Sequence, residues 1–569
     1  NVAVGYAALD ANVSNGGNTA IGDSALTASN GGYYNTAVGY QAGDELTTGN
    51  QSVFIGRGAG HSVTTGHYNT FVGDLAGGET TTASNNTAVG TSALATNTTG
   101  AHNTAVGYAS GAAVTTGIQN TLIGGLAGDV LTDADYNVAL GVSALGADTL
   151  GSKSVALGYS TLTNQNFTTA TDTYNTAVGY TAGSSVTTGI NNTLLGSLSG
   201  DALTDADYNV AVGMQALTAD TLGSRSTAIG YFALGTQNFT TATATYNTAV
   251  GFQTGVAITT ANQSTLIGAL SGDALTSGHT NTALGYLTLS ADTLGNQSVA
   301  IGTGALQSQN FTTATTTYNT AVGVNAGAAI TTGTNNTFVG SLAGDGTDDG
   351  LYNVAVGATA LSANCANANT AIGFSALGAA TGATNTAIGY AAMGEGDVSG
   401  AGNASLGYAS GYAITSGSNN LCLGSDAGRT GSPGGNLTTN SNEVVVGDEN
   451  ITEAHVQVDW TIASDQRDKT DFTALDLGLD FVKALEPVTY KWDKRSKYGD
   501  KTADDYDLNA QSPDGTHKED WLDVGFKAQD VETLEKAAGY KIADKTNLMT
   551  SLTGDGKQMG LQYSKFVPI

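Results

Sequence analysis

One short motif recurs along most of this chain, and it limits the folds that the chain can adopt. It reads N-T-A-V-G or a close variant and, indexed by its glycine, occurs 26 times between Gly5 and Gly447. Of the 25 intervals, 18 are 17 residues long. From Gly107 to Gly323, three intervals of 17 and one of 21 form a 72-residue block that repeats. A fixed period of this kind indicates stacked structural repeats.

The length and chemistry of the repeat point to a β-solenoid. Seventeen residues are too few for a strand–helix–strand unit, which needs about 30 residues. Asn stands four residues before the glycine in 20 of the 26 repeats, as at Asn35 and Asn103, and Asn tolerates left-handed turns and stacks in hydrogen-bonded ladders. The residue before the glycine is always Val, Ile or Leu, and the residue before that is usually Ala.

We therefore expect a mostly β fold, in which a long parallel β-solenoid, or β-roll, is built from coils of about 17 residues. Each coil should hold two short strands, two turns and one aliphatic rung inside. A single coil cannot bury its own apolar face, so stability must accumulate by stacking. Because the core of one coil is thin, we also expect several chains to wrap around a common axis.

Charge divides the chain into two parts. The formal net charge is −29, and residues 1–450 hold 26 acidic residues against only four basic ones, Arg57, Lys153, Arg225 and Arg429. Residues 451–569 hold 22 acidic and 15 basic residues. The almost cation-free first part is a poor nucleic-acid ligand, because phosphates are neutralised by Lys and Arg. No apolar run is long enough for a membrane-spanning helix, so we expect no membrane insertion.

The N-T-A-V-G-Y and Q-S-V-A-I-G coils resemble the YadA-like head repeats of trimeric adhesins. The resemblance covers residues 1–430 and implies a trimeric parallel β-roll that forms a shaft. The same repeat occurs in phage fibres, so the resemblance speaks for architecture more than for function. We expect further residues before Asn1, because the chain opens in the middle of a repeat.

A different composition follows. Residues 431–463 look like a transition segment with one last strand pair over 443–460. Beyond it, the apolar spacing predicts a short helix over 474–484, a strand over 487–493, a polar loop over 500–520, and a strand leading into a helix over 528–538. Residues 464–569 are therefore expected to form a small α+β domain.

This C-terminal part resembles the endosialidase-type intramolecular chaperone of phage tail spikes and fibres. The matching residues are Ser464-Asp465-x-Arg467-x-Lys469, then L-x-x-V-x-Y-x-W over 485–492, then G-F-x-A-Q-D-V over 525–531, and the closing Y-S-K-F-V-P-I over 563–569. Such domains normally continue into a long C-terminal helix, which we expect after Ile569.

The resemblance implies a trimerisation chaperone that cuts itself off at its first serine. Transferred to this chain, the scissile bond is Ala463–Ser464, with Ser464 as nucleophile and Lys469 as general base. The polar turn 465–468 must then fold back to bring the two side chains together. Asp465 and Arg467 are expected to serve as turn or pairing residues. No other enzymatic activity is expected of the chain.

Our leading interpretation is a homotrimeric, receptor-binding fibre of a phage virion that attaches to the host and carries a self-cleaving chaperone. Its partners would be other tail proteins and a host surface glycan or protein; it would be made in the host cytoplasm and act outside the cell. The alternative is a bacterial cell-surface trimeric adhesin built on the same roll. Neighbouring virion genes would decide between them. We expect no cofactor and no metal ion.

Other residues of the chain suggest additional structural or binding roles. Tyrosines directly before the Asn favour a structural ladder over a sugar-stacking stripe. The four-residue insertions of the 21-residue coils are expected to project on one side as candidates for contacts with host glycans. The aspartates of LTDADYN (131–137 and 203–209) are weak calcium candidates, and Cys365 and Cys422 are expected to be small buried hydrophobes. A polysaccharide-degrading spike lacks a distinct carboxylate pair, and Thr-rich segments only faintly suggest ice binding.

Overall fold

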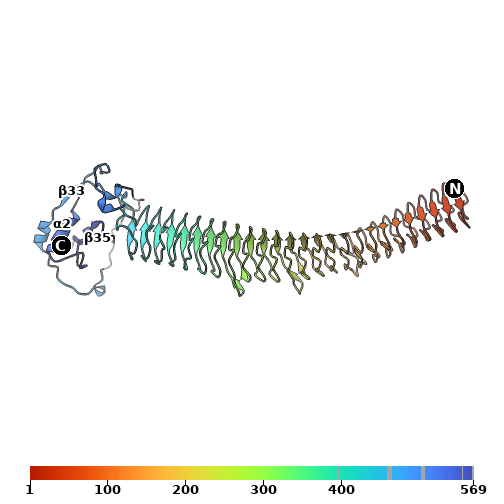
Figure 1. Ribbon diagram of the computed structural model, residues 1–569, viewed down its shortest axis with the longest axis horizontal. Helices are drawn as coiled ribbons and strands as arrows, with labels where there is room; N and C mark the ends of the chain where they lie inside the picture. Colours follow the sequence, from red (N-terminus) through yellow and green to blue (C-terminus); the bar gives the residue numbers. More distant parts are fainter. Residues whose placement is uncertain (395, 458–463, 501–505, 554, 567–569) are drawn as a thin grey trace. The chain divides into compact units, whose positions relative to one another are not determined.

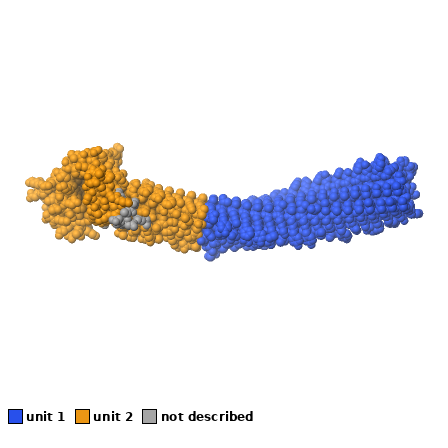
Figure 2. All heavy atoms as spheres, turned by 45° about the horizontal axis from the view of Figure 1, so that its top comes forward, with its two compact units in different colours: residues 1–318 blue, residues 319–569 orange. Residues whose placement is uncertain are grey.

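The computed structural model describes residues 1–394, 396–457, 464–500, 506–553 and 555–566. It divides into two compact units, residues 1–318 and residues 319–569, which Figure 2 colours separately. Both consist largely of stacked coils, so the prediction of a mostly β, parallel solenoid with a small C-terminal domain is confirmed (Figure 1).

The first unit is a stack of parallel three-residue strands, one for each repeat. Neighbours pair in register, so that Thr36, Ala37 and Val38 lie beside Val53, Phe54 and Ile55 of the next coil. The strands are β1 (Val2–Val4), β2 (Thr19–Ile21), β3 (Thr36–Val38), β4 (Val53–Ile55), β5 (Thr70–Val72), β6 (Thr87–Val89), β7 (Thr104–Val106), β8 (Thr121–Ile123), β9 (Val138–Leu140), β11 (Val155–Leu157), β13 (Thr176–Val178), β14 (Thr193–Leu195), β15 (Val210–Val212), β17 (Thr227–Ile229), β19 (Thr248–Val250), β20 (Thr265–Ile267), β21 (Thr282–Leu284) and β23 (Val299–Ile301).

The second unit begins with a stack of coils of the same kind and ends in the C-terminal domain. Its last coil strand pairs with the preceding one, so the stacking reaches into the segment 431–463. The predicted partner strand after it does not form over 451–457, and residues 458–463 lie outside the described residues. The coil strands are β25 (Thr320–Val322), β26 (Thr337–Val339), β27 (Val354–Val356), β28 (Thr370–Ile372), β29 (Thr386–Ile388), β30 (Ala404–Leu406), β31 (Leu421–Leu423) and β32 (Val444–Val446).

The interior of each coil is filled from two places. From β2 onward the middle residue of each coil strand is buried, and Ala37 and Phe54 are fully buried there. The aliphatic rung comes from the turn after the glycine, as with the fully buried Leu26 and Leu46. The Val, Ile or Leu before the glycine lies on the opposite face of the strand, and Ile21 is 40% exposed. Each coil therefore also carries an aliphatic side chain on its outside.

The prediction of two strands in every coil is wrong. Outside the three-residue strands, the described part of the coils has only short parallel pairs that belong to the 72-residue blocks. Elsewhere the chain turns through left-handed residues, for which extended pairing is impossible. The short strands are β10 (Gly151–Ser152) with β12 (Thr171–Asp172), β16 (Gly223–Ser224) with β18 (Thr243–Ala244), and β22 (Gly295–Asn296) with β24 (Thr315–Thr316).

The 21-residue coils are anchored by a buried carboxylate. Asp148 accepts hydrogen bonds from the backbone N–H of Gly151 at 3.0 Å and of Phe167 at 3.2 Å, and from Gln165 Nε2 at 2.5 Å. Burial raises the pKa of Asp148, and the bond from Gln165 opposes this shift. Asp220 and Asp292 have the same pattern of contacts one and two blocks later. The insertions therefore share one packing arrangement, as expected from their common sequence.

The Asn ladder predicted from the sequence is confirmed. Asn103 is fully buried, its backbone N–H donates to Asn86 Oδ1 at 2.8 Å, and its Nδ2 donates to Gly117 O at 2.7 Å. Its own Oδ1 accepts from the backbone N–H of Asn120 at 2.9 Å. Asn103 thus joins three successive coils, because its backbone bonds the preceding coil and its side chain bonds the following one. The ladder satisfies turn groups that would otherwise be buried without a partner.

We expect Asn103→Leu to lower the free energy of unfolding by about 1–3 kcal/mol, because the buried Asn120 N–H and Gly117 O each lose a hydrogen bond. Chemical unfolding followed by circular dichroism measures this change. Asn85→Gln is the control, because Asn85 is exposed and Gln51 and Gln119 occupy the same place in their coils. Equal stability of the two variants would contradict a structural ladder.

Both cysteines are buried and free, as expected for small apolar side chains. Cys365 lies 1% exposed, and Cys422 is the middle residue of β31. Burial raises the pKa of the Cys422 thiol to about 11, which keeps the sulfur in its unreactive protonated form at neutral pH.

The C-terminal domain is small and has a modest core of Phe481, Val531 and Met549. The predicted helix over 474–484 begins only after Gly478, whereas the later strand and helix lie close to their predicted ranges. Its elements are η1 (Gln466–Asp468), α1 (Leu479–Ala484), β33 (Val488–Tyr490), η2 (Arg495–Lys497), η3 (Leu508–Ala510), β34 (Asp523–Gly525), α2 (Ala528–Ala537), β35 (Thr550–Leu552), β36 (Met559–Leu561) and η4 (Tyr563–Phe566). β33 pairs with β34 and β35 with β36, both antiparallel.

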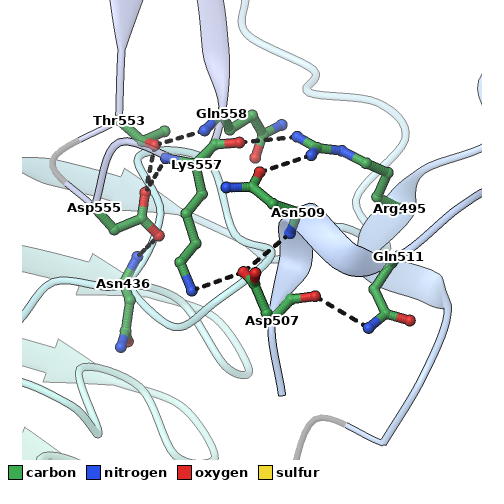
Figure 3. A network of polar contacts seen from close by, with 9 residues as sticks. All are labelled: Asn436, Arg495, Asp507, Asn509, Gln511, Thr553, Asp555, Lys557 and Gln558. Atoms are coloured by element: carbon green, nitrogen blue, oxygen red, sulfur yellow. Dashed lines mark hydrogen bonds and ion pairs between the residues drawn. The ribbon is translucent and has the colours of Figure 1, made fainter. Parts of the chain in front are cut away.

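Polar contacts join this domain to the turn of the last coil (Figure 3). The Asp555 carboxylate accepts from the backbone N–H of Asn436 at 3.4 Å and from the backbone N–H of Lys557 at 3.1 Å. Arg495 donates to Lys557 O at 2.9 Å, and Lys494 Nζ donates to Glu449 O at 2.7 Å. The domain therefore contacts the end of the coil stack through side chains that bond backbone groups.

Candidate self-cleavage site

A single polar turn builds the predicted site. Asp465 caps η1, and its carboxylate accepts from the backbone N–H of Arg467 at 2.9 Å. The Arg467 guanidinium forms a salt bridge with the same carboxylate at 2.6 Å and holds the pKa of Asp465 below its ordinary value. The turn ends at Lys469, whose backbone N–H bonds Gln466 O at 3.2 Å. Asp465 and Arg467 are thus turn and pairing residues, as predicted.

This turn brings the two predicted catalytic side chains together. Lys469 Nζ donates to Ser464 Oγ at 2.5 Å and lies 3.4 Å from Ser464 O. An amine within hydrogen-bond reach of a hydroxyl is the arrangement that a serine nucleophile and its general base require. The third predicted residue, Ala463, lies outside the described residues.

The pair is exposed to solvent in a single chain. Every described residue from Ser464 to Asp476 is exposed. A general base must be neutral to accept a proton, and for an amine the neutral form is favoured by burial or by neighbouring positive charge. The local turn therefore supplies the geometry of the dyad, whereas the described part of one chain supplies no burial for it.

The comparison with known families bears on the same residues. Residues 464–540 match the family model described as chaperone of endosialidase. The C-terminal domain is an endosialidase chaperone domain. The match begins at Ser464, the first described residue of the predicted self-cleavage site, and extends past helix α2. Comparison of the whole chain with curated proteins and with solved structures gave no significant match.

The chaperone domain also holds a buried acid that sequence reasoning missed. Glu535 of α2 is 1% exposed and accepts from the backbone N–H groups of Leu548 at 2.7 Å, Met549 at 2.5 Å and Thr550 at 3.2 Å. It also accepts from the Thr550 hydroxyl. Glu535 lies one turn after the buried Val531 on the same face of α2, which is the signal that could have indicated its burial. Glu535 fixes the entry to β35 and has no contact with the Ser464–Lys469 pair among the described hydrogen bonds.

Other candidate sites do not assemble in the described part of the chain. No group of three His, Cys, Asp or Glu side chains gathers there as a metal site. The aspartates of LTDADYN bind the preceding coil: Asp135 accepts from Ile118 N–H at 2.8 Å, and Asp207 from Ile190 N–H at 2.8 Å. Among the described helices, none has both the length and the apolar character needed to cross a bilayer.

Proposed function

We propose that the protein is a homotrimeric shaft of a phage tail fibre or spike that attaches the virion to its host. Its chaperone domain would direct assembly of the trimer and then release itself between Ala463 and Ser464. The domain's family supports the chaperone role, and the stack of coils supports the role of a shaft.

The observation that carries this proposal is the aliphatic row on the outer face of the strands. Along the strands the residue before the glycine is exposed or half-buried: Ile21 is 40%, Leu140 is 42% and Leu284 is 44% exposed, and Val38 and Val106 are half-buried. A continuous apolar surface of this extent marks a protein–protein interface. Three such rows facing one axis would bury one another and complete the thin core of each coil.

Aromatic side chains directly after the glycine extend the same surface. Tyr159 and Tyr180 of adjacent coils stack with their ring centroids 5.5 Å apart, and Tyr390 and Tyr408 do so at 5.4 Å. These rings are about half exposed in a single chain. Stacked aromatic rows beside an aliphatic row give the area and the rigidity that a permanent subunit interface needs.

The cleavage can be written with the groups at hand. Lys469 takes the proton of Ser464 Oγ, and this oxygen attacks the carbonyl carbon of Ala463. The C–N bond breaks, the Ser464 nitrogen takes up a proton, and an ester joins Ala463 to Ser464 Oγ. Water hydrolyses the ester and leaves a carboxylate on Ala463 and a free α-amine on Ser464. Burial of the pair by the assembled chains would favour the neutral amine that starts the reaction.

Substitutions in the outer aliphatic row test whether this row forms the trimer interface. We expect Leu140→Asp, Leu195→Asp and Ile229→Asp in one chain to give monomers at concentrations where the unchanged protein is a trimer, because each change buries an unpaired carboxylate in the interface. Light scattering after size-exclusion chromatography measures the mass.

Three exposed threonines provide the matched control. Thr48→Asp, Thr65→Asp and Thr99→Asp add the same charge at a turn position where Asp133 and Asp205 occur naturally. These changes should leave the trimer intact. A trimeric mass for both variants would contradict the proposed interface.

A further inference from the structure

A second exposed column runs along residues 1–318, at the position just before the buried Asn or Ser of each coil. Residues here adopt left-handed backbone conformations, with φ of 61° at Tyr136 and 51° at Tyr174, which turns their side chains away from the interior. Aromatic residues alternate with amide or basic residues from Tyr34 to Tyr318, with His102 and Thr280 in two of the aromatic places. The central part of this tyrosine column reads Tyr136, Lys153, Tyr174, Asn191, Tyr208, Arg225 and Tyr246.

The tyrosines do not form the structural ladder that the sequence favoured. They lie two coils apart, about 9.6 Å at the usual strand spacing, which is beyond the range of ring stacking. Among the described ring contacts, none joins two members of the tyrosine column. Tyr174 is 53% and Tyr208 is 50% exposed, so the rings are available to a ligand.

Two of the intervening side chains, Lys153 and Arg225, contact three of the rings. The Arg225 guanidinium lies 5.6 Å from the ring centre of Tyr208 and 5.7 Å from that of Tyr246. Lys153 Nζ lies 5.2 Å from the Tyr174 ring and donates to the Tyr174 hydroxyl at 3.2 Å. Lys153 also pairs with Asp172 of the first insertion at 2.5 Å. Rings fixed in this way lose little conformational entropy on binding a ligand.

The alternation of aromatic rings and amides has the chemistry of a carbohydrate-binding surface. The C–H face of a pyranose packs on an aromatic ring, and its hydroxyls bond to amides such as Asn191, which offer both donors and acceptors. A repeat of about 9.6 Å, set by every second coil, is close to one disaccharide of an extended β-linked chain, so one polymer can meet successive rings in register. Residues 1–318 hold only three basic residues, which disfavours an anionic polymer.

We propose that the tyrosine column binds a neutral, linear, β-linked hexose polysaccharide along the shaft. The inference rests on the proposed attachment function and assigns its ligand class and its place. It also relates the insertions to binding: Tyr174 and Tyr246 directly follow inserted segments, and Asp172 anchors Lys153 beside Tyr174. The insertions would support the column.

Affinity electrophoresis of the full chain in native gels tests the proposal. The probes are hydroxyethylcellulose and mixed-linkage barley β-glucan, with α-linked pullulan as the comparison gel. We expect retardation in at least one β-glucan gel and none in pullulan. Tyr136→Asn, Tyr174→Asn and Tyr208→Asn together should weaken the retardation at least about tenfold. Asn suits these positions, because Asn85 and Asn191 occupy the same column with φ of 61° and 58°.

The matched control changes the neighbours of the rings. Gln119→Asn, Gln263→Asn and Gln297→Asn keep an amide in the column and should keep the retardation. Unretarded migration of the unchanged protein in both β-glucan gels would overturn the proposal, as would undiminished retardation of the tyrosine variant. A tyrosine variant that no longer forms trimers would assign the column to the subunit interface and also overturn it. An unchanged trimer that is cleaved normally but binds neither glucan would remove only this inference and leave the proposed function standing.

Discussion

Ser464→Ala should leave the chain uncut, as one 56.9 kDa polypeptide, under conditions in which the unchanged protein is fully divided into a shaft ending at Ala463 and a C-terminal fragment. The reason is that the hydroxyl contacted by Lys469 at 2.5 Å is the proposed nucleophile. Lys469→Ala should have the same effect, because Ser464 then lacks a base. Denaturing gels and N-terminal sequencing of the fragment measure both outcomes.

The control for these variants is Lys483→Ala, which removes an exposed lysine of α1. It should be cut normally. Normal processing of the Lys469→Ala chain would refute the dyad, and a new fragment that starts at a residue other than Ser464 would refute the assigned bond.

Cleavage should also depend on assembly. The chain with Leu140→Asp, Leu195→Asp and Ile229→Asp leaves Ser464 and Lys469 unchanged, yet we expect it to remain uncut, because the exposed pair acquires burial only in the trimer. A monomeric variant that is cut at the normal rate would contradict this dependence. Removal of the chaperone after assembly would leave a shaft protected by slow unfolding rather than by equilibrium alone.

Gly124→Ala should disrupt the stack at that coil and lower the free energy of unfolding by at least about 4 kcal/mol, which places it among the most damaging single substitutions. The glycine has φ of +137°, and a Cβ on it would lie 2.4 Å from the backbone oxygen of Gly141 in the next coil. The motif glycine is thus required both by its conformation and by the close approach of two coils. Thermal unfolding followed by circular dichroism measures the loss.

The adjacent glycine provides the comparison. A Cβ on Gly125 would meet no atom within 4 Å, so Gly125→Ala should change stability by less than about 0.5 kcal/mol. Similar destabilisation by both changes would mean that the motif glycine is not held by contact with its neighbour. Together the two variants show whether the loss of stability comes from the close approach of Gly124 to Gly141 or from any side chain added to this turn.

The coil stack could be predicted because its determinants are local and repeated. The glycine that admits no Cβ and the Asn that bonds two neighbouring turns recur at a fixed period, so the sequence alone reveals them. The alternation of the short strand could not indicate which face is buried. The middle position is buried whether it holds Ala37 or Phe54, and the residue after it, such as Val38, lies on the outer face, so residue size did not identify the inner face.

What was missed depends on partners distant in sequence. Asp148 and Gln165 look like surface residues, yet they bury each other across one coil. Glu535 is buried because it accepts hydrogen bonds from the backbone of residues 548–550, which lie 13 to 15 residues further along the chain. The prediction of a site at Ser464 and Lys469 came from the family resemblance. The spacing of the two residues required only that the chain turn between them. Asp465 stabilises this turn by capping η1.

The 72-residue block is the unit by which such a shaft can change its length. Each block contains its own buried Asp–Gln pair and its own insertion, so the contacts of one block, such as Asp148 with Gln165, do not depend on the number of blocks. Tandem segments of similar sequence also favour unequal recombination in their gene. Gain or loss of one whole block preserves every Asn and glycine contact at the junction, whereas a partial exchange would break them. We therefore expect natural variants of this shaft to differ by whole blocks, so that selection can adjust its reach in fixed steps.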